Sequence, residues 1–210
     1  MFNILIYSSV FFPTIPLIIG FFRWGKLSSI QRILVFIILT TLISDLLTLS
    51  LRQTNHNNHW VYHIYVPVFF ILLIFLYKKL LANLPQLFFH ILQFSFLFFC
   101  LINSLFFQNI NSFNSNAVTV AWFIYLYFAL TYFYQLLKNP PNGSLIKNPV
   151  FWFNTGIILY HSSTIILFGV LNHLLKQSNE VMYASWVLNI IFTIVLNCFY
   201  LLTICIKSTQ

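Results

Sequence analysis

The sequence contains almost no acidic side chains. Asp45 and Glu180 are the only two carboxylates among 210 residues, and only 6% of the residues are charged. Soluble domains carry about 25% charged residues, so a chain this poor in charge cannot give itself a water-compatible surface. The scarcity of charge therefore excludes a soluble enzyme or a soluble binding domain.

Glycine and cysteine are scarce as well. The five glycines form no glycine-rich nucleotide loop, and no GxSxG or P-loop pattern occurs. The three cysteines are odd in number, lack CxxC spacing and all lie in apolar runs, at Cys100, Cys198 and Cys205. The sequence therefore predicts no disulfide framework and no zinc knuckle, and we expect no cofactor.

Apolar residues, by contrast, are abundant and come in long runs. The chain is 60% hydrophobic and 20% aromatic. A helix needs about 20 apolar residues to cross a bilayer, and continuous runs favour helices over an alternating β-barrel. The sequence predicts an all-α integral membrane protein, a single transmembrane domain over 1–210, with seven helices at about 2–22, 33–51, 60–77, 86–107, 118–137, 150–175 and 183–206.

The basic residues indicate how this bundle crosses the membrane. They stand at the ends of the apolar runs, as the positive-inside rule describes, and not in a basic patch of the kind that binds nucleic acid. If the N-terminus lies outside, two basic residues, Arg52 and Lys176, fall on the outer side. The other eight basic residues then face the cytoplasm: Arg23, Lys26, Arg32, Lys78, Lys79, Lys138, Lys147 and Lys207. We therefore expect an outer N-terminus, a cytoplasmic C-terminus and no nucleic-acid partner.

Asp45 is a carboxylate inside a predicted membrane span. Such a group costs about 2.5–3.5 kcal/mol at mid-membrane, so it should face the bundle interior and be protonated or find a partner. We expect that partner to be His63, because a short loop joins the second and third helices. An intramembrane acid indicates a functional site, and a structural polar clamp between helices is an equal alternative.

Other polar side chains fall at similar depths in the later spans. They are suited to form, with Asp45 and His63, one polar pocket that opens outward, and they comprise Tyr65, Tyr160, His161, Asn189 and Asn197.

The stretch "HNNHWVYH" places His59 and His63 four residues apart at the start of a helix. That spacing suits two ligands of one metal ion, with His173 and Glu180 as further candidates. The alternative is an interfacial loop that Trp60 anchors among lipid headgroups. We expect no metal and keep His59 and His63 as the weak candidates.

The stretches 16–47, 57–70, 151–163 and 186–200 resemble a family of bacterial seven-helix membrane proteins, which occur alone or as the membrane part of sensor histidine kinases. The family often has a Glu shortly after its "HIY" motif, where this chain has Val68. The resemblance adds Asn154 to the expected pocket; the matching positions are Asp45, His63, Tyr65, Asn154, Gly156, Tyr160, Asn189 and Asn197.

The resemblance and the outward pocket together predict a non-enzymatic sensory protein of the bacterial inner membrane. No kinase domain follows the last span, so we expect it to act through a partner in the membrane or cytoplasm, such as a histidine kinase. Two alternatives remain. One is a lipid-modifying enzyme that uses Asp45 and His63 as an acid–base pair. The other is a channel or transporter subunit, whose path is lined by Asp45, Asn189 and Asn197 and which assembles as a homo-oligomer.

Overall fold

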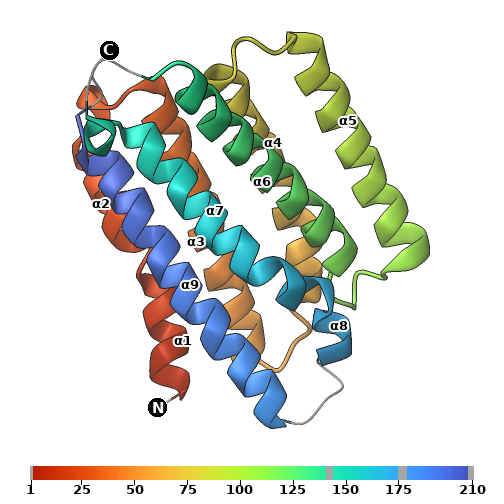
Figure 1. Ribbon diagram of the computed structural model, residues 1–210. Coiled ribbons are helices and arrows are strands. Elements are labelled where there is room, and N and C mark those ends of the chain that lie inside the picture. The colour runs from red at the N-terminus through yellow and green to blue at the C-terminus, as the bar shows by residue number, and fades with distance from the viewer. Residues whose placement is uncertain (1, 141–143, 175–178, 208–210) are drawn as a thin grey trace.

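The computed structural model describes residues 2–140, 144–174 and 179–207. Within these residues the regular structure is entirely helical, without a strand. Seven helical segments are long and apolar enough to span a membrane, and they pack side by side into one bundle (Figure 1). The prediction of an all-α chain with seven helices of membrane-spanning length and hydropathy is thereby confirmed.

The helices agree closely with the predicted spans. The bounds are α1 Phe2–Phe11, α2 Thr14–Phe22, α3 Ser29–Gln53, α4 His59–Leu80, α5 Gln86–Ile102, α6 Ser115–Lys138, α7 Pro149–Gly169, α8 Leu171–Leu174 and α9 Asn179–Cys205. A π-helical turn over Asn103–Phe107 extends α5, and 3-10 turns occupy Trp24–Lys26 and Leu145–Lys147. The predicted end of the sixth span at Leu175, and Lys176 beyond it, lie outside the described residues.

The first span is two helices, α1 and α2, where the sequence predicts a single helix over about 2–22. Pro13 has no backbone N–H to donate to the preceding turn, and its ring crowds the carbonyl four residues earlier. The helix therefore stops at Phe11 and resumes at Thr14. Pro67, in contrast, lies within an uninterrupted α4. The break leaves α1 as a short separate helix that contacts α9 and α3.

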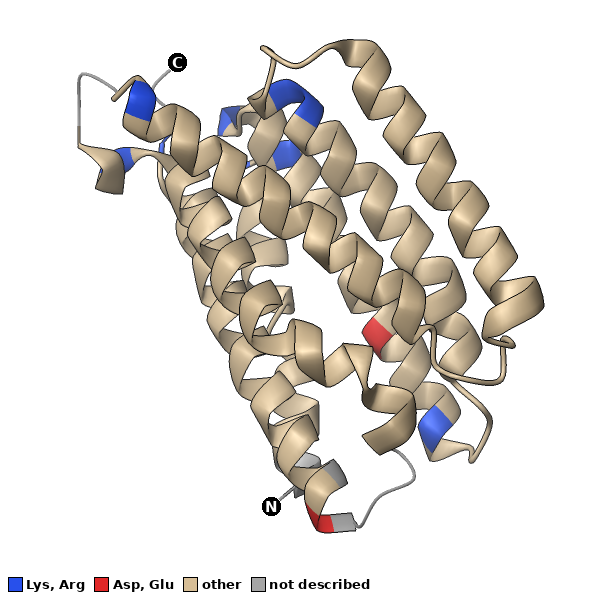
Figure 2. Cartoon of the chain, turned by 45° about the vertical axis from the view of Figure 1, so that its right-hand side comes forward, with Lys and Arg blue, Asp and Glu red and all other residues tan. Residues whose placement is uncertain are grey.

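The bundle has two ends, which we call the N end, where α1 begins, and the C end, where α9 finishes (Figure 1). Among the described residues, Lys and Arg gather at the C end (Figure 2), and the exception is Arg52, in the last turn of α3 at the N end. Glu180, in the first turn of α9, also lies at the N end, whereas Asp45 lies within α3. The basic side chains of the described residues therefore concentrate at one end of the bundle, and the two acidic side chains lie elsewhere.

Polar side chains fasten the helices together at the C end. Ser28 and Gln31 form a capping box that starts α3. The Gln31 amide also donates to the carbonyl oxygens of Thr203 at 2.7 Å and Ile206 at 2.9 Å. The Arg23 guanidinium donates to the Cys205 carbonyl at 2.5 Å. The last turn of α9 is therefore tied both to α3 and to the residue that follows α2.

The half of the bundle toward the C end is densely packed. Tyr77 stacks on Phe128 with ring centroids 5.2 Å apart, and it lies 6.1 Å from the ring of Phe153. All three are fully buried, as are Leu73 and Ile204. This half forms a continuous core, and the cavities described next lie mainly beyond it.

Candidate functional site

A wide cavity of about 560 Å³ lies toward the N end of the bundle. Its size falls in the range of about 300–1,000 Å³ that is typical of small-molecule sites. Helices α1, α3, α4, α8 and α9 form its walls, with Phe113 from the loop before α6; the lining residues are Ile6, Ser9, Val10, Asp45, Thr48, Leu49, Arg52, Asn58, His59, Tyr62, Phe113, Leu171, Tyr183, Trp186, Asn189, Ile190 and Thr193.

A deep cavity of about 100 Å³ continues into the bundle between α3, α4, α6, α7 and α9. Water has about 30 Å³ per molecule in the liquid, so this space can hold roughly three waters. Its lining is Ile38, Thr41, Asp45, Tyr62, Tyr65, Val66, Phe69, Val118, Ala121, Trp122, Tyr125, Tyr160, His161, Phe168, Asn189, Thr193, Leu196, Asn197 and Tyr200.

Four residues line both cavities, and we call them the neck: Asp45, Tyr62, Asn189 and Thr193. They come from α3, α4 and α9 and are all polar. Because the two cavities share these walls, a molecule at the neck contacts both spaces.

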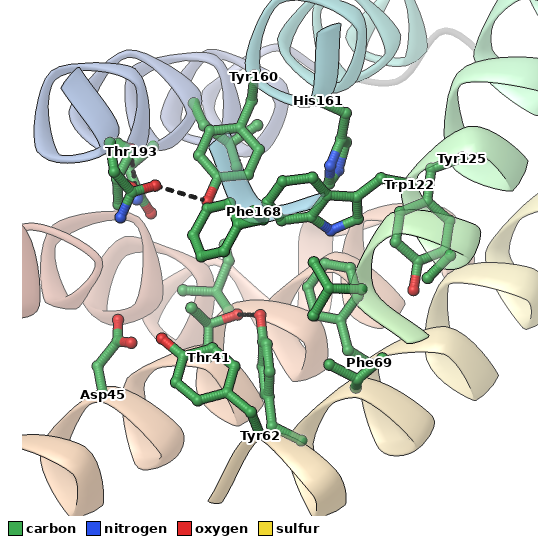
Figure 3. Close-up of a pocket in the computed structure, with 18 of the residues that line it drawn as sticks. Thr41, Asp45, Tyr62, Phe69, Trp122, Tyr125, Tyr160, His161, Phe168 and Thr193 are labelled. Carbon is green, nitrogen blue, oxygen red and sulfur yellow. Dashed lines mark hydrogen bonds between the residues drawn. The ribbon is translucent and has the colours of Figure 1, made fainter. Parts of the chain in front are cut away.

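Asp45 supplies the only acid of the neck. Its carboxylate points from α3 into the cavity, toward the side on which Tyr62, Tyr160 and Thr193 lie (Figure 3). Among the described residues it forms neither a hydrogen bond nor an ion pair. An acid inside a membrane span is protonated or finds a partner, and no described side chain supplies that partner here.

Hydroxyl and amide groups surround the acid without closing on it. The Tyr160 hydroxyl donates to the Asn189 Oδ1 at 3.3 Å, and the Tyr65 hydroxyl lies 3.2 Å from the Thr41 Oγ1. Figure 3 shows both pairs on opposite sides of the space. These hydroxyl and amide groups therefore pair with one another around the neck, and neither pair includes Asp45.

His161 lies in the deep cavity inside an aromatic box. Its ring is 5.1 Å from that of Trp122, 5.2 Å from Tyr125 and 5.0 Å from Tyr160. It is only 2% exposed, and neither ring nitrogen has a hydrogen-bond partner among the described residues, nor has the hydroxyl of Tyr200. Buried polar atoms without protein partners require water or a ligand group, and both side chains line this cavity.

The structure brings together six of the eight side chains expected in one polar pocket. Those lining the deep cavity are Asp45, Tyr65, Tyr160, His161, Asn189 and Asn197. His63 and Asn154 lie elsewhere.

His63 does not contact Asp45. Its Nδ1 lies 2.7 Å from the Ser104 Oγ, and its Nε2 donates to the Ser112 carbonyl at 3.0 Å. The short loop does make α3 and α4 neighbours, but His63 stands on the side of α4 that faces α5. The expected Asp45–His63 contact is therefore wrong.

The same contacts remove His63 as a metal ligand, since both ring nitrogens are engaged by the protein. His59 remains in the wall of the wide cavity. No group of three or more His, Cys, Asp or Glu able to hold a metal ion occurs within the part of the chain that the structure describes.

Asn154 is a packing residue of the C-end half. It is fully buried, accepts a hydrogen bond from the Tyr77 hydroxyl at 2.9 Å and donates to the Val150 carbonyl at 2.9 Å. This clamp joins α4 to α7 and lies outside both cavities.

Sequence reasoning missed several residues that line the site. A signal existed for two of them, because Thr41 precedes Asp45 by one helical turn and Thr193 lies one turn from both Asn189 and Asn197. Trp122 and Tyr125 gave no comparable signal, since aromatic residues are common throughout this chain. Only the packing of α6 against α7 shows that they surround His161.

Comparisons with known proteins add no assignment. No protein-family model matches the chain, and no curated protein and no solved structure shows significant similarity to it.

Proposed function

We propose that this chain is a sensory protein of the bacterial inner membrane, which binds a small molecule at the neck and passes the resulting change to a signalling partner such as a histidine kinase. The resemblance described from the sequence supports the same class. The observation that carries the proposal is the neck itself: an acid within a membrane-spanning helix, without a partner among the described residues, in the wall of a cavity of ligand size.

The proposal places the N end outside the cell. Among the described residues Lys and Arg concentrate at the C end (Figure 2), which the positive-inside rule assigns to the cytoplasm. Arg52 and Asn58, near the ends of their helices, line the wide cavity, so a molecule from the outer side would enter there.

Helix α9 provides the path for a signal. It contributes walls to both cavities, and its last turn is held by Gln31 and Arg23 at the opposite end. A ligand that shifts α9 at the neck acts on these contacts, and differential binding to two arrangements is what makes a ligand a signal.

The two alternative functions find less support. The acid–base pair required of a lipid-modifying enzyme is not formed, because His63 bonds to serines away from Asp45. A channel needs a path through the C-end half, where Leu73, Phe153 and Ile204 are fully buried.

A reporter at the end of α9 tests the proposal. Cys205 is exposed; with Cys100→Ala and Cys198→Ser it becomes the single thiol for an environment-sensitive fluorophore. A panel of cationic, anionic, zwitterionic and neutral small molecules is screened for thermal stabilisation of the labelled protein in nanodiscs. We expect at least one compound both to stabilise the protein and to change the emission.

The matched control is Asn189→Leu, which alters the neck without touching Cys205 and should abolish both responses. If a compound stabilises the protein through the neck and the emission of the fluorophore at Cys205 stays constant, the result contradicts sensing. Flux of ions or protons across proteoliposomes that depends on Asp45 favours the channel alternative.

A further inference from the structure

We propose that the wide cavity binds a zwitterion, with an amine directed toward Asp45 and an anionic group directed toward Arg52; this inference rests on the proposed function and specifies its ligand. Asp45 is the only acid in the lining of the cavity and Arg52 the only Lys or Arg. The two therefore give this space an internal charge polarity.

Both charges lie on one face of one helix. Asp45, Thr48, Leu49 and Arg52 occupy positions i, i+3, i+4 and i+7 of α3, and all four line the wide cavity. Seven residues (52 − 45) rise about 10.5 Å at 1.5 Å per residue. The two charged residues therefore lie about two helical turns apart along the cavity wall.

The acid and the base do not neutralise each other. No ion pair or hydrogen bond joins their side chains to each other or to any other described residue. A ligand that carried only a positive charge would satisfy Asp45 and meet repulsion from Arg52, and an anion would have the opposite problem. A molecule with both charges, spaced by several ångströms, satisfies both.

The remaining groups of the lining suit the two ends of such a molecule. At the neck, Asn189 and Thr193 offer oxygen acceptors for an ammonium group, and the ring of Tyr62 lies beside it (Figure 3). Near Arg52, the amide of Asn58 and the imidazole of His59 add potential donors for an anionic group.

This chemistry has two possible sources. One is a soluble ω-amino acid from the outer side, and the other is the headgroup of phosphatidylethanolamine, which joins an amine to a phosphate. Both present a primary amine and an anion at short separation, so the experiment must distinguish them.

Calorimetry on the protein in phosphatidylglycerol nanodiscs tests the charge requirement. The probes are 4-aminobutyrate, 6-aminohexanoate and 8-aminooctanoate, compared with hexylamine and hexanoate, which carry one charge each. We expect 6-aminohexanoate to bind at least tenfold more tightly than either singly charged probe. Asp45→Asn should weaken its binding about tenfold or more, since a charge-assisted hydrogen bond contributes about 1.5–3 kcal/mol.

Arg52→Gln should lower the affinity for 6-aminohexanoate to that for hexylamine. The variant should bind hexylamine at least as tightly as the unmodified protein does. Lys138→Gln, an exposed charge at the C end, is the matched control and should change nothing. Size-exclusion profiles establish that each variant is folded. Equal binding of hexylamine and 6-aminohexanoate, insensitivity to Asp45→Asn, or no binding of any zwitterion overturns the inference.

Two further measurements identify whether the zwitterion is a soluble molecule or a lipid headgroup. Competition by glycerophosphoethanolamine, together with weaker probe binding in phosphatidylethanolamine nanodiscs, identifies the headgroup, and unchanged binding identifies a soluble zwitterion; either result supports the charge assignment. The Cys205 reporter separates this inference from the proposed function. Charge-dependent binding with a silent reporter upholds the zwitterion site and refutes sensing.

Discussion

Gly156→Ala should destabilise the bundle, because α7 packs closely against α9 at this position. A Cβ at position 156 would lie 2.8 Å from the Phe199 Cβ and 3.3 Å from the Leu196 Cδ1. Ordinary contact begins at 3.4 Å, so the helices must separate locally by about 0.6 Å (3.4 − 2.8). The Phe199 Cβ is fixed to the α9 backbone and cannot rotate away.

The expected cost is about 1–3 kcal/mol, the usual penalty for an extra methyl group in a tight core. In a soluble helix alanine would recover about 1 kcal/mol over glycine. Transmembrane helices keep their backbone hydrogen bonds even when they separate, so most of that gain is absent here. At roughly 2–4 °C per kcal/mol for a chain of this size, the midpoint of thermal unfolding should fall by about 2–12 °C.

The assay heats purified protein in mild detergent and measures the remaining monodisperse fraction by size exclusion. Gly25→Ala is the control, because no atom lies within 4 Å of a Cβ at that position, and it should leave the midpoint unchanged. Equal midpoints for the two variants would refute the close approach of α7 and α9.

Three further substitutions test other parts of the structure in the same assay. Tyr77→Phe should cost about 1–3 kcal/mol, because the buried oxygen of Asn154 loses its donor; a change below about 0.5 kcal/mol, the usual effect of a surface substitution, would contradict that clamp. Gln31→Leu should lower the midpoint and increase the reactivity of the Cys205 thiol, since it frees two carbonyl groups at the end of α9; unaltered reactivity would argue against the tie. His63→Leu should destabilise the protein through its two serine contacts yet leave probe affinity at the neck unchanged, and a loss of affinity in folded protein would return His63 to the site.

The sequence was sufficient for the fold because a bilayer imposes one requirement on each span. Long apolar runs must be helical, and the seven spans follow from that rule alone. The break after Phe11 was less predictable, since a proline either kinks or ends a helix according to what the neighbouring helices pack against. Pro67 stays inside α4 and Pro13 does not.

The site was predictable in part for a similar reason. Polar residues in a membrane span avoid lipid, so Asp45, Asn189 and Asn197 face a common interior. His63 shows where that reasoning ends, because a polar residue can turn to any neighbouring helix, and the serines near the π-helical turn of α5 offered it partners. Depth along the membrane is readable from sequence, whereas the rotation of a helix about its axis depends on packing.

The separation of α1 from α2 has a consequence for how the wide cavity is maintained. Its wall on that side, through Ile6, Ser9 and Val10, belongs to a helix of ten residues. The break at Pro13 removes helical hydrogen bonds that would tie α1 to α2, so the position of this wall depends on the contacts of α1 with α9 and α3. Amide exchange should therefore be faster in α1 than in α2, and α1 is the wall of the wide cavity that a ligand can displace most readily.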